Sequence, residues 1–327
     1  MKLGTLKSKS SRDGELCVVG RDLKRAVRVT SIAPSLREAM ENWTTVAPRL
    51  KKVSDELNSG KADGAFAVKL EDFHSALPRT WLFADGSAFI HHIKLVRMAR
   101  KAALPETLQT VPLMYQAECG QFLAPDQDIP QRDFAHGTDF EAEVGVIVDD
   151  VPMGVSPEKA LEHIQLVVLI NDVSLRGLIP GELGQGFGFF QSKPASALSP
   201  FAVTVDELSD SWKEGRLHLP LNVQYNEQFF GKANAGQMHF HFGQLIAHAA
   251  KTRNLVAGTL IGSGTVSNED PAMGSSCLAE KRMIEQIAKG QPETSFMKVG
   301  DTVEIWMQDA AGQDIFGHIR QAVKKAL

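Results

Sequence analysis

Two glutamates at the head of a strand-like stretch are the first residues whose spacing suggests chemistry. The stretch reads DFEAEVGVIVDD over residues 139–150. In an extended chain alternate side chains share a face, so Glu141 and Glu143 point the same way, roughly 7 Å apart. Carboxylates beside apolar neighbours need either water or a positive partner. A metal site and the wet face of a sheet are both compatible with this pattern.

A third carboxylate follows a second apolar stretch, LVVLINDVS at 166–174. Asp172 lies where this strand opens into the loop that carries Arg176. Three carboxylates around one point would hold a hard cation such as Mg²⁺, Mn²⁺ or Ca²⁺, because such ions prefer oxygen ligands. In the alternative interpretation, the glutamates are solvated and Asp172 caps a turn.

Three further residues are candidates on chemical grounds. Lys193 stands between the apolar, glycine-rich stretch GQGFGFF and Pro194, and it could stabilise an enolate or bind an anion. Thr265 lies in GSGTVSN, whose glycines can expose backbone N–H groups to a ligand. A surface lysine and an ordinary turn are the respective alternatives. His136, just upstream of the glutamates, is the one histidine retained, since those at 239, 241 and 248 suit structural or surface roles.

The elements that must position these residues form a β-rich α+β pattern without regular βα alternation. The expected strands cover 15–21, 25–29, 166–174, 217–226 and 301–309. Expected helices begin at Ser35, where Glu38 completes a capping box, at Ser156 and near 242, and Pro48 should break or restart the first. Residues 1–75 read as a small N-terminal domain before a catalytic domain at 76–327. An N-terminal extension of a single domain is the alternative.

The composition excludes several classes of function. The chain has 327 residues, 43% hydrophobic and 23% charged, with a formal charge of −4, so no basic field would attract nucleic acid. The longest aliphatic run is far too short for a membrane span, and no leader is apparent, so we expect a cytoplasmic protein. Three widely spaced cysteines suit a reducing compartment and predict no thiolate metal site.

Together the motifs resemble those of the fumarylacetoacetate hydrolase (fumarylacetoacetase) family. The resemblance rests on DFEAEVGVIVDDVPMG, INDVSLRG, QSKPASALSP and GTLIGSGTVSN, in that order, over residues 78–325. LPRTWLFADGSAF after a small N-terminal module is similar to the longer members. The resemblance implies a mixed β-sandwich roll with an SH3-like N-terminal domain, and a homodimer.

The resemblance also implies roles for the candidate residues. Glu141, Glu143 and Asp172 would hold Mg²⁺ or Ca²⁺, with Mn²⁺ a further option. Lys193 and Arg176 would stabilise anionic oxygens, and Tyr115 and Thr265 would bind the substrate. That substrate would be a small diketo acid, such as an acylpyruvate.

One segment departs from the family pattern. Fumarylacetoacetases carry a fourth carboxylate ligand upstream of the glutamates and, a few residues later, a histidine that activates water. In PLMYQAECGQF (112–122) Leu113 stands about where that aspartate is expected, and no histidine follows. Glu118 and His136 remain as candidates for the general base.

The resulting hypothesis is a divalent-metal-dependent hydrolase. It would cleave a C–C bond in an acylpyruvate or fumarylacetoacetate-like acid during aromatic or tyrosine catabolism. The alternatives are a decarboxylase, hydratase or isomerase of related 2-oxo acids, and a metal-binding protein without hydrolytic activity.

Overall fold

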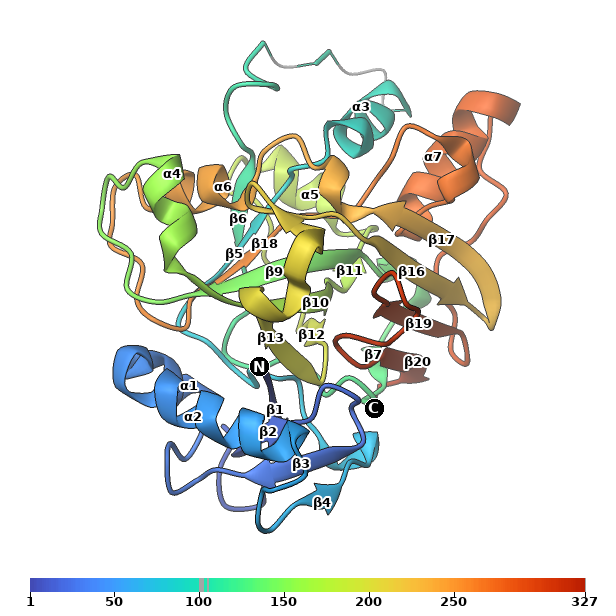
Figure 1. Ribbon diagram of the computed structural model, residues 1–327. Coiled ribbons are helices and arrows are strands. Elements are labelled where there is room, and N and C mark those ends of the chain that lie inside the picture. The colour runs from blue at the N-terminus through green and yellow to red at the C-terminus, as the bar shows by residue number, and fades with distance from the viewer. Residues whose placement is uncertain (100–102, 105, 327) are drawn as a thin grey trace.

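The computed structural model describes residues 1–99, 103–104 and 106–326 and has a β-rich α+β architecture. Two sheets form its centre, and most helices lie around the edges of these sheets (Figure 1). The predicted fold class is therefore confirmed.

The larger sheet has eleven strands and carries the residues of interest near its centre. Its order is β4-β3-β2-β1-β13-β10-β9-β18-β5-β6, and β12 pairs with β10. The central strands are β10 (Ile164–Asn171), β9 (Ala142–Val148), β18 (Leu260–Gly262) and β5 (Phe83–Gly86). The others are β1 (Lys2–Leu6), β2 (Glu15–Val19), β3 (Arg25–Arg28), β4 (Phe66–Ala67), β6 (Met114–Ala117), β12 (Ala197–Leu198) and β13 (Phe201–Thr204).

The second sheet packs on one face of the first and completes a sandwich. Its five strands have the order β17-β16-β19-β20-β7. They are β7 (Ile129–Gln131), β16 (Pro220–Tyr225), β17 (Gln228–Asn234), β19 (Thr302–Met307) and β20 (Ile319–Lys325). Two short ribbons, β8 (Thr138–Asp139) with β11 (Ser174–Leu175) and β14 (Trp212–Lys213) with β15 (Arg216–Leu217), lie outside both sheets.

Side chains along β9 alternate between two hydrophobic clusters, one on each face of the large sheet. Val144 and Val146 pack with the second sheet, in one cluster with Val223 and Ile305. Ile147 belongs instead to the cluster on the opposite face. The predicted two-residue period therefore holds, and it directs Glu141 and Glu143 away from the sandwich core.

Some helices match the sequence pattern and others were not anticipated. Ser35 caps α1 (Leu36–Glu41), Ser156 caps α4 (Pro157–Ala160), and α6 (Phe242–Ala249) lies where expected. The predicted break at Pro48 is wrong, because α2 continues through it; the interruption comes earlier, at Asn42. Helices α3 (Ile90–Ala99), α5 (Ile179–Gly184) and α7 (Leu278–Lys289) complete the set, with α2 covering Trp43–Asn58. Among the described residues, no helix has the length and apolar character needed to cross a bilayer.

The N-terminal residues share a sheet and a core with the rest of the chain. Strand β1 pairs antiparallel with β13, which extends the large sheet into the N-terminal part. Leu36 and Leu50 of α1 and α2 pack in one cluster with Leu166 and Val168 of β10. In Figure 1 these two helices lie across the blue strands at the lower end of the molecule.

Candidate active site

Four buried carboxylates meet at the centre of the large sheet. Glu141 and Glu143 come from the start of β9, Asp172 follows β10, and Asp85 belongs to β5. Each is at most 5% exposed. One oxygen from each of Asp85, Glu143 and Asp172 lies within 4.8 Å of the others, a spacing suited to shared ligation of one cation.

Glycines make room for Asp85 inside the sheet. Gly262 of β18 lies between Gly145 of β9 and Asp85 of β5 in the strand register. A Cβ atom on Gly262 would lie 2.2 Å from the Asp85 Oδ1 atom. The same oxygen accepts a hydrogen bond of 3.2 Å from the backbone N–H of Gly264. The missing side chain on β18 therefore creates the space into which the carboxylate projects.

Glu143 has the least compensated charge of the cluster. Both of its carboxylate oxygens are buried and lack a hydrogen-bond partner among the described residues. Burial, followed by repulsion from Asp85 and Asp172, raises the pKa of Glu143 well above its ordinary value. Burial similarly raises the pKa of Asp85 to about 7. An oxygen-only cluster with unsatisfied buried acceptors fits a hard divalent cation.

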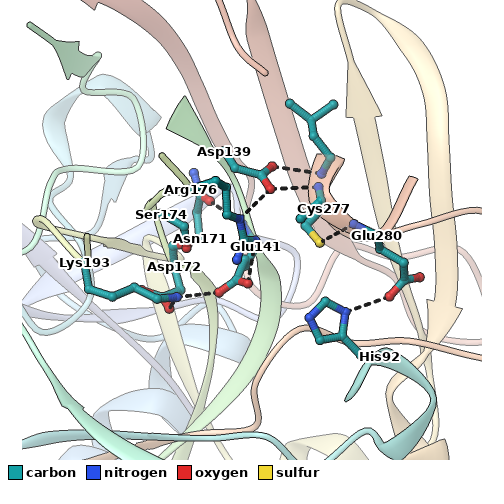
Figure 2. A network of polar contacts seen from close by, with 12 residues as sticks. His92, Asp139, Glu141, Asn171, Asp172, Ser174, Arg176, Lys193, Cys277 and Glu280 are labelled. Carbon is teal, nitrogen blue, oxygen red and sulfur yellow. Dashed lines mark hydrogen bonds and ion pairs between the residues drawn. The ribbon is translucent and has the colours of Figure 1, made fainter. Parts of the chain in front are cut away.

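Glu141, in contrast, is paired with two cations. The Lys193 Nζ atom lies 2.6 Å from Glu141 Oε2 and 2.5 Å from Asp172 Oδ2. Arg176 Nη2 lies 2.6 Å from Glu141 Oε1. Burial opposes ionisation, but Arg176 and Lys193 outweigh it and lower the pKa of Glu141 well below its ordinary value. Figure 2 shows Glu141 between the two cationic side chains.

The same neighbours keep Lys193 charged. Burial alone would lower the pKa of its ammonium group, but Asp172 and Glu141 outweigh burial and raise it. Asp172 also accepts hydrogen bonds from Tyr115 Oη at 2.5 Å and Ser196 Oγ at 2.7 Å. The ring of Phe189 packs edge-on against Tyr115, with centroids 4.9 Å apart.

Asp139 connects this cluster to helix α7. Its side chain accepts from Arg176 Nε at 2.9 Å and from the backbone N–H groups of Leu278 and Ala279 at 2.8 and 2.9 Å. These N–H groups belong to the first turn of α7, where backbone donors have no partner within the helix. Asp139 thus fixes Arg176 and the helix start relative to each other.

A histidine–carboxylate pair lies on the other side of Glu141. His92 of α3 places its Nδ1 atom 2.9 Å from Oε2 of Glu280 on α7. Glu280 is 1% exposed, and α3 packs against α7. Because a carboxylate can only accept, Nδ1 is the donor and the Nε2 atom of the neutral ring is left as an acceptor. Figure 2 shows this second nitrogen on the side of the ring that faces Glu141.

These groups surround a cavity of about 380 Å³. Its lining includes polar groups, among them Glu143, Lys193 and His92. It also includes apolar side chains: Ile93, Leu113, Ile179, Leu183, Phe189 and Met283. Such a cavity suits a small acid whose charged end meets the cluster and whose remainder is apolar.

Most of the candidates chosen from the sequence meet here, and two do not. Glu141, Glu143, Arg176, Lys193, Tyr115 and Thr265 line the cavity, and Asp172 bonds to Lys193 and Tyr115. His136 and Glu118 are not among the lining residues. His136 ends a 3₁₀ turn, and the exposed Glu118 accepts a hydrogen bond from Gly120 N. Neither is placed to act as the base.

The fourth carboxylate of the cluster, Asp85, lies on the strand next to the segment that follows Leu113. Tyr115 on β6 is paired directly with Asp85 on β5, so the segment 112–122 lies beside the aspartate instead of supplying it. His92 follows Asp85 in the same run, FADGSAFIHH, at the start of α3. This order of aspartate and then histidine was the available signal. Glu280, Asp139 and Ser196 gave no comparable signal because only the fold brings them here.

Comparisons with known proteins identify the family. Residues 82–324 match the model of the fumarylacetoacetate (FAA) hydrolase C-terminal region, and residues 1–79 match fumarylacetoacetase N-terminal domain 2. The chain belongs to the fumarylacetoacetate hydrolase family.

Named relatives are distant. Fumarylacetoacetase of Caenorhabditis elegans is 28% identical over 68% of this chain and 64% of its own length. The 2,4-didehydro-3-deoxy-L-rhamnonate hydrolase of Sphingomonas sp. (strain SKA58) is 26% identical over 63% of this chain and 65% of its own length. These matches thus span less than two thirds of either relative.

A solved structure shares the fold over its full length. Maleylpyruvate hydrolase from Sphingobium sp. SYK-6, in complex with manganese(II) ion and pyruvate, aligns with a TM-score of 0.65 at 14% identity. The alignment covers 100% of both chains. At this identity the likeness shows the fold alone.

Proposed function

We propose that this protein is a divalent-metal-dependent hydrolase that cleaves the C–C bond of an acylpyruvate. The single observation that carries the proposal is the pairing of an oxygen-only carboxylate cluster with the His92–Glu280 dyad across one cavity. Family membership and the manganese–pyruvate complex of the structural relative support it.

Asp85, Glu143 and Asp172 would hold the cation, with Glu141, directly before β9, as a fourth ligand. The orphaned oxygens of Glu143 are the observation that favours a resident ion. When bound, Mg²⁺, Mn²⁺ or Ca²⁺ supplies a Lewis acid for the neighbouring oxygens of a 2-oxo acid.

His92 is the general base in this proposal. Its Nε2 atom accepts a proton from water, which attacks the acyl carbonyl carbon. Glu280 holds the ring through Nδ1 and stabilises the imidazolium that forms, as a carboxylate does for histidine in hydrolytic triads. Asp139 and Cys277 fix the first turn of α7, from which Glu280 projects.

Lys193 acts on the leaving fragment. The bond between the acyl carbon and the adjacent methylene breaks, giving a carboxylic acid and the enolate of pyruvate, which takes a proton on carbon. The buried, charged ammonium of Lys193 stabilises the enolate oxygen. Overall, one acylpyruvate and one water give one carboxylic acid and one pyruvate.

The test is turnover of an acylpyruvate by purified protein with Mg²⁺ or Mn²⁺, followed by loss of the enol absorbance. We expect activity that EDTA abolishes and that falls by about 100-fold or more in His92→Asn. His136→Asn is the matched control and should retain activity. Full activity in His92→Asn, or no turnover with any acylpyruvate and metal, would contradict the proposal.

A further inference from the structure

A second group of ligand-type side chains lies beside the carboxylate cluster. His92, Glu141 and Cys277 each offer one ligand atom, and these atoms lie within 4.8 Å of one another. His92 lies on α3, Glu141 directly precedes β9, and Cys277 is the N-cap residue of α7. The set contains nitrogen, oxygen and sulfur, whereas Asp85, Glu143 and Asp172 offer oxygen alone.

The histidine is held in the orientation of a metal ligand. Glu280 accepts from His92 Nδ1 at 2.9 Å, which leaves Nε2 as the free atom. In Figure 2 Nε2 faces Glu141 and away from Glu280. A carboxylate behind a ligating histidine fixes its tautomer and makes it a stronger ligand.

The cysteine is placed to act as a thiolate ligand. Cys277 is fully buried, and its Sγ atom accepts the backbone N–H of Glu280 at 3.3 Å as the N-cap of α7. Burial raises the pKa of the Cys277 thiol well above its ordinary value, so a bound cation must displace the proton from sulfur. The start of this twelve-residue helix offsets part of the cost of the thiolate that then forms. Glu141 has both oxygens in ion pairs, but each oxygen has a second lone pair available.

We propose that His92, Glu141 and Cys277 form a second metal site, selective for a borderline-soft divalent cation such as Zn²⁺, and that its occupation inhibits the enzyme. Zinc bonds to nitrogen, oxygen and sulfur at about 2.0–2.3 Å, which places tetrahedral ligand atoms about 3.5 Å apart. The three atoms lie within 4.8 Å of one another, so no pair has to close by more than about 1.3 Å to reach that spacing. Mg²⁺ and Ca²⁺ do not suit this donor set, because they prefer oxygen ligands.

The local charges are compatible with a dication. Arg176 and Lys193 lie close, each 2.6 Å from an oxygen of Glu141, and both would oppose the ion. Asp139, which pairs with Arg176, and Glu280, which pairs with His92, offset that positive charge. With the thiolate and Glu141 added, negative charges outnumber positive ones around the site.

Inhibition rests on the proposed function, because His92 Nε2 would be bound to the ion and could no longer accept a proton from water. Glu141 is also the proposed fourth ligand of the cation in the carboxylate cluster, so the second ion would compete with that cation for Glu141. The wide spacing of the three cysteines predicted no thiolate metal site, because that criterion requires cysteines that lie close together in the sequence. A mixed site from distant segments is invisible to that criterion.

Co²⁺ binding tests the site without any need for turnover. The purified protein is first stripped of metal and then saturated with Mg²⁺. It is titrated with Co²⁺, and the near-ultraviolet absorption of a thiolate–Co²⁺ bond is recorded. Wild type and the Cys119→Ser control should show the band, and Cys277→Ser should lack it. Serine preserves the helix cap, so the variant should fold. Absence of the band in wild type, or its persistence in Cys277→Ser, would overturn the proposal.

Zinc inhibition tests the consequence separately. Zn²⁺ should inhibit the Mg²⁺-loaded enzyme, and Cys277→Ser should need at least tenfold more Zn²⁺ for the same inhibition while Cys119→Ser behaves as wild type. If wild type, Cys277→Ser and Cys119→Ser are equally sensitive to Zn²⁺, inhibition takes place at the oxygen cluster, and the proposal of inhibition through the second site is overturned. If no acylpyruvate is turned over at all, the proposed function fails, whereas the Co²⁺ result still decides the site.

Discussion

Glu143 is the residue on which the metal assignment depends most, because its buried carboxylate oxygens have no partner among the described residues. The sequence placed it correctly on the same face as Glu141, since strand alternation is a local property. What alternation could not reveal was that the two glutamates have opposite environments. Arg176 and Lys193 neutralise Glu141 alone, and both come from loops distant in sequence.

The Glu143→Gln variant tests this assignment. We expect divalent-cation affinity to fall about tenfold or more, because a charged ligand becomes a neutral one in a buried site. Isothermal titration calorimetry with Mn²⁺ measures it, with the exposed Glu118 changed to Gln as the matched control. Equal affinity in Glu143→Gln and wild type would remove the metal from this cluster.

Asp85 and His92 mark the limit of sequence reasoning at this scale. The resemblance implied a fourth carboxylate and a histidine near Tyr115, whereas the aspartate and histidine of this cavity lie on the neighbouring strand β5 and on α3. Strand pairing between β5 and β6 makes the two segments neighbours in space. The sequence alone does not favour the segment around Asp85 over the segment around Tyr115.

At the scale of elements, β18 determines whether the carboxylates can converge. It separates β9 from β5, and its Gly262 leaves the space that Asp85 occupies. The sequence indicated that glycines in GSGTVSN were useful for exposing backbone. Their second role, admitting a side chain from a neighbouring strand, depends on strand order and so was not predictable.

Gly262→Ala should therefore weaken metal binding although it replaces no ligand residue. The new Cβ would lie 2.2 Å from Asp85 Oδ1, so the carboxylate must move. We expect an affinity loss of about tenfold or more by calorimetry. Gly184→Ala, where an added Cβ meets nothing within 4 Å, is the control. An unchanged affinity in Gly262→Ala would mean that Asp85 is not a ligand.

Helix α7 illustrates a missed element with a local signal. Its apolar residues Leu278, Met283 and Ile287 and the left-handed Gly290 after its end are typical of a helix. None of the helices predicted from the sequence covers this segment. Missing α7 meant missing Glu280, the partner of His92.

His318, just before β20, gives the second sheet a pH-dependent contact. Its ring stacks on Trp306 and pairs with Glu304 at 2.7 Å and Asp314 at 3.2 Å. Burial opposes protonation, but these hydrogen bonds and charges outweigh it and raise the pKa of His318. The protonated ring therefore stabilises the folded protein. This stabilisation is fully present below the unfolded-state pKa of about 6.5 and is lost as the pH rises through the higher folded-state pKa.

We therefore expect His318→Gln to lower the free energy of unfolding at pH 5.5 and to matter progressively less toward pH 9. Urea unfolding of both proteins across this range measures the difference. A penalty that stays constant with pH would show that the imidazolium contributes nothing and that only packing is lost.

At the scale of the whole molecule, the first 75 residues share a hydrophobic cluster with the rest of the chain. Leu50 of α2 is fully buried in one cluster with β10, which also supports the catalytic cluster. The sequence left two alternatives open here, a separate domain and an extension, because hydrophobic periodicity indicates an apolar face but not its partner. The expected homodimer remains a prediction, and light scattering of the purified protein would test it.

Leu50→Ala should destabilise the entire chain by about 2–5 kcal/mol, the usual cost of such a truncation in a core. Because the core is shared, circular dichroism and tryptophan fluorescence should report a single unfolding transition in denaturant. Leu70→Ala, at a site 42% exposed, is the control and should change little. Two separate transitions, with only one shifted by Leu50→Ala, would mean that the N-terminal part folds independently.

The central claim, that this chain hydrolyses an acylpyruvate, is tested most directly by isotope tracing. The purified protein, loaded with Mg²⁺ or Mn²⁺, is given an acylpyruvate with an apolar acyl group in ¹⁸O-labelled water, and the products are analysed by mass spectrometry. The proposed mechanism predicts pyruvate together with a carboxylic acid that carries one solvent oxygen in its new carboxyl group. Release of CO₂, or recovery of an isomer of the substrate in place of two acids, would contradict it.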